Sequence, residues 1–104
     1  MGKAATESIG EVLAVRNTHV RLSGSIDHEN ITHFRWVEEE SSKTGSIAKA
    51  SLVEWIDIQG GRAYVGSPNG RADVGVIRPQ GRVPYLRTYA DGEWNNNLLS
   101  LPRF

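Results

Sequence analysis

Three histidines are the residues of this sequence with the most obvious potential for chemistry, because His19, His28 and His33 fall close together. Asp27 and Glu29 flank the middle one. Imidazole nitrogens and carboxylates together can ligate zinc and other divalent cations. The spacing matches no metal-binding motif such as H-E-x-x-H, however, and isolated histidines on strands and loops are usually ordinary polar residues. We therefore expect no metal site, and a metal-dependent hydrolase built on these histidines ranks last among three functional hypotheses.

A second group of side chains near the C-terminal end could bind an anion or a nucleobase. Alternate residues of a strand share one face, so Arg87 would stand between the rings of Tyr85 and Tyr89. A guanidinium group in that position can hold a base by stacking and an anion by a bidentate contact. In the interpretation that we favour, Arg87 instead caps carbonyl groups of the C-terminal segment, while Asp and Asn side chains close turns. The candidate binding residues are Tyr85, Arg87, Tyr89, Asp91, Trp94, Asn96 and Asn97.

Trp94 is the one tryptophan without an obvious core position, because it follows an Asp-Gly turn in a polar stretch. A partly exposed indole there could anchor a protein partner. Alternatively, Trp94 could cover the edge of the core together with Leu98 and Phe104. The sequence slightly favours this second role.

Signatures of catalysis are absent from the sequence. There are no cysteines, which excludes thiolate nucleophiles, disulfides and cysteine-based metal centres. No Gly-x-Ser-x-Gly elbow occurs, and the glycine-rich segment 66–70 lacks the lysine and the following helix of a phosphate-binding loop. We expect no catalytic residues, no cofactor and no enzymatic activity.

Length and composition predict one small domain. The chain has 104 residues, and 12 basic residues balance 12 acidic ones, so the net charge is zero. Segment 1–8 is small and polar, so we expect a disordered tail followed by a single domain over residues 9–104. The start of the chain has no signal-peptide pattern and no stretch is apolar enough to cross a membrane, which predicts a cytoplasmic protein without membrane association.

Runs of β-branched and aromatic residues predict strands over residues 12–22, 31–38, 62–65, 72–77 and 84–90. The alternation of apolar and polar residues shifts at Asn17-Thr18, which indicates a bulge or bend there. In the second strand Phe34 and Trp36 mark the core face. The serine-rich segment 41–46 is expected to be a flexible loop.

One helix is predicted after that loop. Ser51 and Glu54 have capping-box spacing, and Gly60-Gly61 predicts a left-handed end. The helix would place an apolar stripe on the sheet, made of Leu52, Trp55 and Ile56. Near the C-terminal end, a leucine-rich turn capped by an asparagine should dock on the core. The predicted fold class is α+β, with an antiparallel sheet of about five strands and one short helix packed across it.

The C-terminal half resembles a known family once its motifs are set out. They are Tyr-Leu-Arg-Thr over 85–88, Ala-Asp-Gly over 90–92, Trp94, and Asn-Asn-Leu-Leu-Ser-Leu-Pro over 96–102. The chain resembles, over residues 12–104, a family of small prokaryotic and phage-associated proteins classed as a domain of unknown function. This resemblance implies a small single-domain protein, and it implies no activity, substrate or cofactor.

Together these observations favour a non-enzymatic binding module whose partner is an unidentified protein. The alternative is nucleic-acid binding, which requires the fold to gather arginines on one face and which the neutral net charge does not favour. The arginines in question are Arg16, Arg21, Arg35, Arg78, Arg82 and Arg87. An exposed edge strand would permit dimerisation, and the pattern leaves the oligomeric state open.

Overall fold

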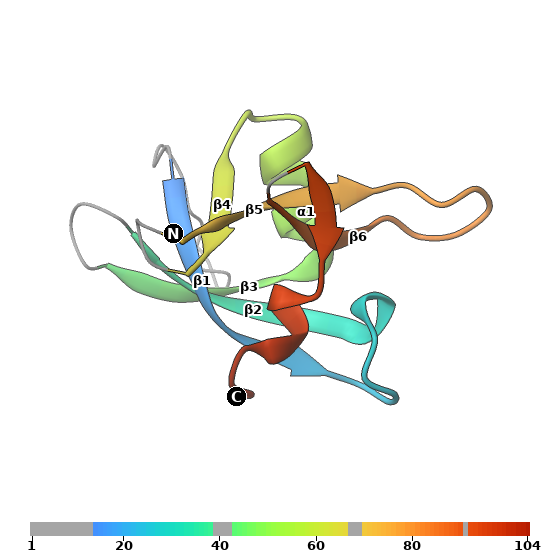
Figure 1. Ribbon diagram of the computed structural model, residues 1–104, viewed down its shortest axis with the longest axis horizontal. Coiled ribbons are helices and arrows are strands. Elements are labelled where there is room, and N and C mark those ends of the chain that lie inside the picture. Colours follow the sequence, from blue (N-terminus) through green and yellow to red (C-terminus); the bar gives the residue numbers. More distant parts are fainter. Residues whose placement is uncertain (1–13, 39–42, 67–69, 91) are drawn as a thin grey trace, which may run out of the picture.

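The computed structural model describes residues 14–38, 43–66, 70–90 and 92–104, so the predicted tail over 1–8 lies outside the described residues. A seven-stranded sheet forms the body of the molecule, in the order β3-β2-β1-β4-β5-β6-β7 (Figure 1). Its strands are β1 (Ala14–Leu22), β2 (Ile31–Glu38), β3 (Thr44–Ala48), β4 (Arg62–Val65), β5 (Ala72–Ile77), β6 (Tyr85–Ala90) and β7 (Glu93–Asn95). One α-helix, α1 (Lys49–Asp57), and two short 3-10 helices, η1 (His28–Asn30) and η2 (Asn97–Ser100), complete the described elements.

The sheet is mixed, which corrects the predicted antiparallel sheet of about five strands. β1 and β4 pair in parallel, while the other neighbours pair antiparallel. The reason is the connection between β3 and β4. Helix α1 carries the chain from one edge of the sheet past β2 and β1, and β4 then joins β1 from the far side. The α+β class is as predicted, with one α-helix in the part of the chain that the structure describes.

Two strands form where sequence patterns predicted loops. β3 begins at Thr44 in the segment expected to be flexible, and β7 contains Trp94. Both lie at the edges of the sheet, where backbone hydrogen bonds to an established neighbour hold residues of low strand propensity. Residues 41 and 42 of the predicted loop lie outside the described residues.

Helix α1 begins earlier than the capping-box pattern predicted. It starts at Lys49 with Ala48 in the N-cap position and no side-chain cap, so Ser51 lies within the first turn. The cause is that β3 runs directly into the helix without a loop. The predicted end is confirmed, since Gly60 has a φ of 75°. No described helix has the length and apolar character needed to span a membrane.

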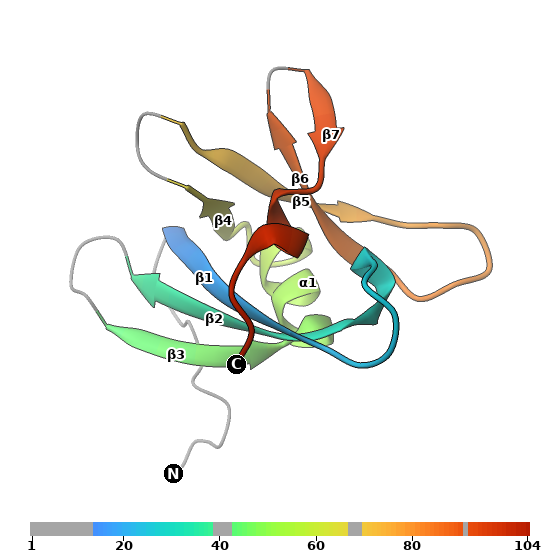
Figure 2. The same ribbon diagram turned by 60° about the horizontal axis from the view of Figure 1, so that its bottom comes forward.

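The core lies between the sheet and α1. Phe34 and Trp36 are buried, as predicted for the core face of β2, and Leu52 and Trp55 bury the apolar stripe of the helix. In Figure 2, α1 lies behind β1 and β2 while the C-terminal segment passes in front of them.

The C-terminal segment docks on the fold as predicted. Leu98 in η2 is fully buried, and the backbone N–H of Val20 donates to the carbonyl oxygen of Pro102 at 2.9 Å. Val20 also forms a parallel bridge with Arg103. Because β4 pairs with β1 only as far as Arg16, the C-terminal segment takes up the part of this strand edge that β4 leaves free.

Candidate functional site

Arg87 ties the C-terminal segment to β6. Its Nε donates to the carbonyl oxygen of Asn95 at 3.2 Å, and one of its terminal nitrogens donates to Oδ1 of Asn96 at 3.2 Å. This is the capping arrangement that the sequence favoured over a ligand-binding one. Asp91, the remaining charged residue of the predicted group, lies outside the described residues.

A buried hydroxyl reinforces the same junction, and the sequence analysis missed it. Thr88 Oγ1 donates to Asn95, whose carbonyl oxygen lies at 3.1 Å, and accepts a hydrogen bond from the backbone N–H of Asn97 at 3.1 Å. Asn95 Oδ1 accepts from the same N–H at 3.0 Å. Strand alternation could have predicted this contact, because Thr88 shares a face with the core residue Leu86 and its buried hydroxyl needs a hydrogen-bond partner.

Tyr89 and Trp94 form an exposed aromatic pair. Their ring centroids lie 5.1 Å apart at 72°, and each side chain is 42% exposed. The indole covers Gly75, where a Cβ atom would come within 2.9 Å of it. Trp94 therefore packs on the sheet beside Tyr89, and the predicted cover shared with Leu98 and Phe104 is not formed.

His28 lies apart from the other two histidines, beside Tyr85 with ring centroids 6.4 Å apart. Its Nε2 is buried and no described residue accepts or donates a hydrogen bond there. Burial lowers the pKa of His28 from the ordinary 6.5, the positive charge of Arg87 lowers it further, and Asp27 acts in the opposite direction. His28 is thus a neutral packing residue of η1 at neutral pH.

The lowered pKa of His28 predicts a pH-dependent stability. Below about pH 6.5 His28 is protonated in the unfolded state but stays neutral in the folded state until its lowered pKa is reached. The free energy of unfolding therefore falls as the pH drops through this value. The loss from this residue ends below the folded-state pKa. Urea unfolding between about pH 8 and about pH 5 should show a smaller decline for His28→Gln than for the natural protein. Equal declines in the two proteins would contradict this account.

The histidines do not come together around a metal ion. His19 Nδ1 lies 2.9 Å from Oγ1 of Thr18, and His33 Nδ1 lies 2.9 Å from Oγ1 of Thr32. No cluster of three or more His, Cys, Asp or Glu side chains suited to a metal occurs in the described part of the chain.

A bulge in β1 gathers charged residues on one side of the sheet. The pairing of β1 with β2 shifts between Asn17 and His19, as the sequence predicted. Val15, Asn17 and Val20 therefore all point to the core. Without the extra residue, positions 16 and 21 would lie on opposite faces. With it, the side of β1 and β2 away from the core carries Arg16, His19, Arg21, His33, Arg35 and Val37, which we call the outer face.

Phe104 lies on this outer face between two arginines. The guanidinium carbons of Arg21 and Arg35 lie 4.6 Å and 5.0 Å from the centre of its ring. Arg21 Nε donates to the carbonyl oxygen of Phe104 at 3.0 Å, and the His19 ring approaches edge-on at 6.3 Å. Sequence reasoning placed Phe104 at the edge of the core, and nothing in its local pattern pointed to these contacts.

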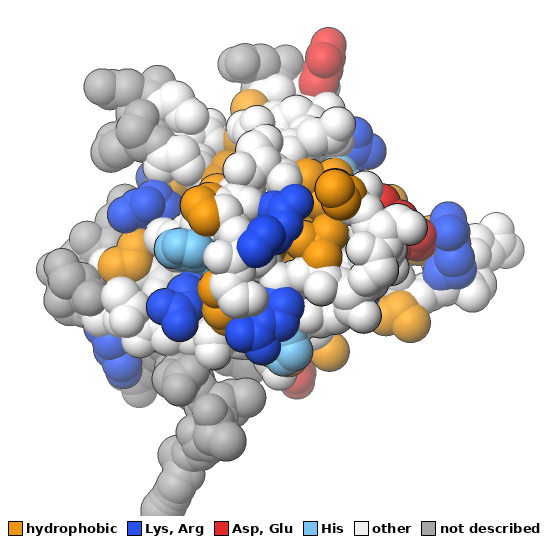
Figure 3. Space-filling model, turned by 90° about the horizontal axis from the view of Figure 1, so that it is seen from below, with side chains coloured by type: hydrophobic (Ala, Val, Ile, Leu, Met, Phe, Trp, Pro, Cys, Tyr) orange, Lys and Arg blue, Asp and Glu red, His pale blue; other side chains and the backbone are white. Residues whose placement is uncertain are grey.

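The outer face is positively charged although the whole chain is neutral. The residues of β1, β2 and β3 that point away from the core include Arg16, Arg21 and Arg35 and no Asp or Glu. In Figure 3, Lys, Arg and His side chains are spread over this side of the molecule, and Asp and Glu side chains appear toward its margin.

The other three arginines of the predicted set lie elsewhere and have partners. Arg78 forms an ion pair with Asp57, and Arg82 lies 3.2 Å from Glu29. Arg87 holds the C-terminal segment. The fold therefore brings together half of the arginines that the nucleic-acid hypothesis required.

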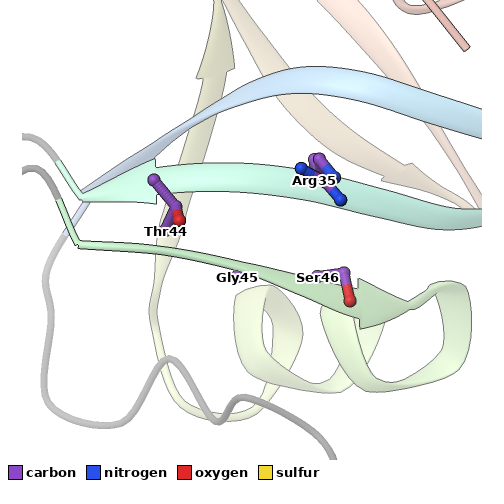
Figure 4. A pocket seen from close by; sticks show the side chains of 4 residues that line it. All are labelled: Arg35, Thr44, Gly45 and Ser46. Atoms are coloured by element: carbon purple, nitrogen blue, oxygen red, sulfur yellow. The ribbon is translucent and has the colours of Figure 1, made fainter. Parts of the chain in front are cut away.

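A hollow of about 250 Å³ opens at one edge of the outer face. It is lined by Arg35 of β2 and by Thr44, Gly45 and Ser46 of β3 (Figure 4). A second hollow, of about 310 Å³, lies at β4 and β5, and its described lining includes one carboxylate, Asp73, beside Arg62 and Arg71.

Comparison with known proteins assigns the chain to a family. A family model described as "Protein of unknown function (DUF3892)" matches residues 15–102. The chain belongs to this family. The match runs from the second residue of β1 to Pro102, so it includes the outer-face residues of β1 and β2 and the Arg87 junction but ends before Arg103 and Phe104. No curated protein and no solved structure matches the chain.

The family assignment confirms part of the resemblance drawn from the sequence. A domain of unknown function was expected over residues 12–104, and the matched range agrees closely. The C-terminal signature and the prokaryotic and phage association stay predictions.

Proposed function

We propose that this protein is a non-enzymatic module that binds single-stranded nucleic acid on its outer face. The observation that carries the proposal is the grouping of Arg16, Arg21 and Arg35 on one side of three adjacent strands, without an acidic side chain among the described residues pointing the same way. Such a surface attracts phosphates, whose neutralisation supplies most of the affinity of nucleic-acid-binding proteins.

The arrangement of rings favours a single strand over a duplex. His19, His33 and Phe104 lie among the arginines, so planar groups alternate with positive charges across the outer face. Unpaired bases stack on such rings and on guanidinium planes, whereas a duplex keeps its bases stacked on each other. A sheet face of this kind lets successive nucleotides lie across neighbouring strands.

The neutral net charge is compatible with this function because the charges are segregated. The described acidic residues that neutralise arginines lie away from the outer face, with Asp57 in α1 and Glu29 in η1. The protein-partner hypothesis rested on Trp94, which is 42% exposed and packs against Tyr89 and Gly75, so that region offers one aromatic pair, whereas the outer face offers three arginines and three rings. The charged face is therefore the better supported binding surface.

Binding to a fluorescent single-stranded DNA of mixed sequence tests the proposal. Three phosphate contacts on single-stranded nucleic acid give a slope of about −2 for the logarithm of the association constant against that of the salt concentration. Fluorescence anisotropy should therefore show an affinity that falls by about 16-fold between about 50 mM and about 200 mM salt. A duplex of the same sequence should bind more weakly.

Absence of binding at low salt would overturn the proposal, and so would binding that does not respond to salt. Tighter binding of the duplex would contradict the role given to unpaired bases.

A further inference from the structure

The hollow between β2 and β3 has the composition of an anion-binding site. Among the described residues, its lining consists of one guanidinium group, the hydroxyl-bearing residues Thr44 and Ser46, and Gly45, and includes no carboxylate. Ser46 is the direct cross-strand partner of Arg35, and Thr44 lies two residues along the same strand, on the same side of the sheet. Gly45 falls between them and pairs with the core residue Trp36.

The side chain of Arg35 is held in place and keeps its hydrogen-bond donors available. Its guanidinium group stacks over the Phe104 ring at 5.0 Å. None of the described residues accepts a hydrogen bond from it, in contrast to Arg87, whose donors are used within the protein. A cation with a fixed orientation and unused donors loses little conformational entropy when it binds an anion.

We propose that this hollow holds one phosphodiester group of the bound strand. The inference rests on the proposed function and adds to it the place at which the strand is held. Arg35 donates in bidentate fashion to two phosphate oxygens, a geometry that lysine cannot reproduce. The Thr44 hydroxyl donates to the same phosphate from the neighbouring strand. Because β3 is the edge strand of the sheet, the rest of the bound nucleic acid can continue past β3 in either direction.

Charge-conserving variants distinguish phosphate binding at this site from general electrostatic attraction to the outer face. Arg35→Lys keeps the positive charge but loses the fork, so its affinity for single-stranded DNA should fall about fivefold to tenfold while the salt slope stays unchanged. Thr44→Val keeps the shape of the side chain and should lower the affinity by about threefold to fivefold. Arg78→Lys, in the loop after β5, is the matched control and should bind like the natural protein.

A titration of the ¹⁵N-labelled protein with inorganic phosphate makes the test independent of the oligonucleotide. Amide signals of Thr44, Gly45 and Ser46 and the Nε–H signal of Arg35 should shift at millimolar phosphate, and Arg35→Lys should abolish the shifts. If DNA binds but Arg35→Lys and Thr44→Val behave like the control, the assignment of the phosphate to this hollow is wrong and the proposed function stands. If phosphate shifts these signals but no DNA binds, the hollow is an anion-binding site and nucleic acid is not its ligand.

Discussion

Replacing Gly61 with alanine should lower the free energy of unfolding by about 3 kcal/mol, because the new methyl group would overlap ring atoms of the buried Trp55. Gly61 lies in the turn after α1 and donates its N–H to the carbonyl oxygen of Trp55 at 3.0 Å, so the backbone cannot move away from the indole without losing this bond. The midpoint of thermal unfolding should fall by more than about 10 °C. Urea unfolding followed by circular dichroism measures the change.

Gly60→Ala is the matched control at the neighbouring position. Gly60 has a φ of 75° and nothing lies within 4 Å of the place where a Cβ atom would be. Its substitution costs only the strain of a left-handed residue, about 1 kcal/mol. A loss at position 61 no larger than the loss at position 60 would contradict the packing of Trp55 described above.

Removing two outer-face arginines together should weaken binding of single-stranded DNA by more than about tenfold. Arg16→Gln/Arg35→Gln eliminates two of the three proposed phosphate contacts and leaves Arg21 to hold Phe104. Each lost contact lowers the magnitude of the salt slope by about 0.7, so the slope should change from about −2 to about −0.7. Fluorescence anisotropy over a salt series gives the affinity and the slope together.

Arg78→Gln/Arg82→Gln changes the net charge by the same amount away from the outer face. Both arginines are already paired, with Asp57 and Glu29, so the affinity should stay within about twofold of the natural protein. Equal losses in the two double variants would show that overall charge governs binding, and the outer face would lose its special role.

Much of the fold could be predicted because several segments carry strong local patterns. The strand Ile31–Glu38 was predicted with its core face, since Phe34 and Trp36 alternate with polar residues. The left-handed end of the helix at Gly60 followed from glycine chemistry. Docking of the C-terminal segment followed from the burial that Leu98 requires.

The missed features depend on partners that are distant in sequence. Strand β3 has serine and glycine where a strand usually has β-branched residues, and its backbone pairing with β2 decides its structure. The parallel pairing of β1 with β4 depends on how α1 crosses the sheet, and strand patterns do not encode the direction of a neighbour. Helix α1 begins at Lys49 because β3 leads into it, so the capping pattern at Ser51 was overridden.

The outer face also combines a feature that the sequence predicted with features that depend on distant residues. The bulge near Thr18 was visible in the sequence, but its consequence required the register with β2, which places Arg16 and Arg21 on one side together with Arg35. The contacts of Phe104 with Arg21 and Arg35 depend on the course of the C-terminal segment along β1.

The most direct test of the central claim is an NMR titration of the ¹⁵N-labelled protein with single-stranded DNA at low and moderate salt. We expect localised, salt-sensitive shifts along β1, β2 and β3, centred on Arg16, Arg21 and Arg35, with little change in the loop that holds Arg78 and Arg82. Shifts confined to the Tyr89–Trp94 region, or the absence of any shift, would contradict the assignment of the outer face as the binding surface.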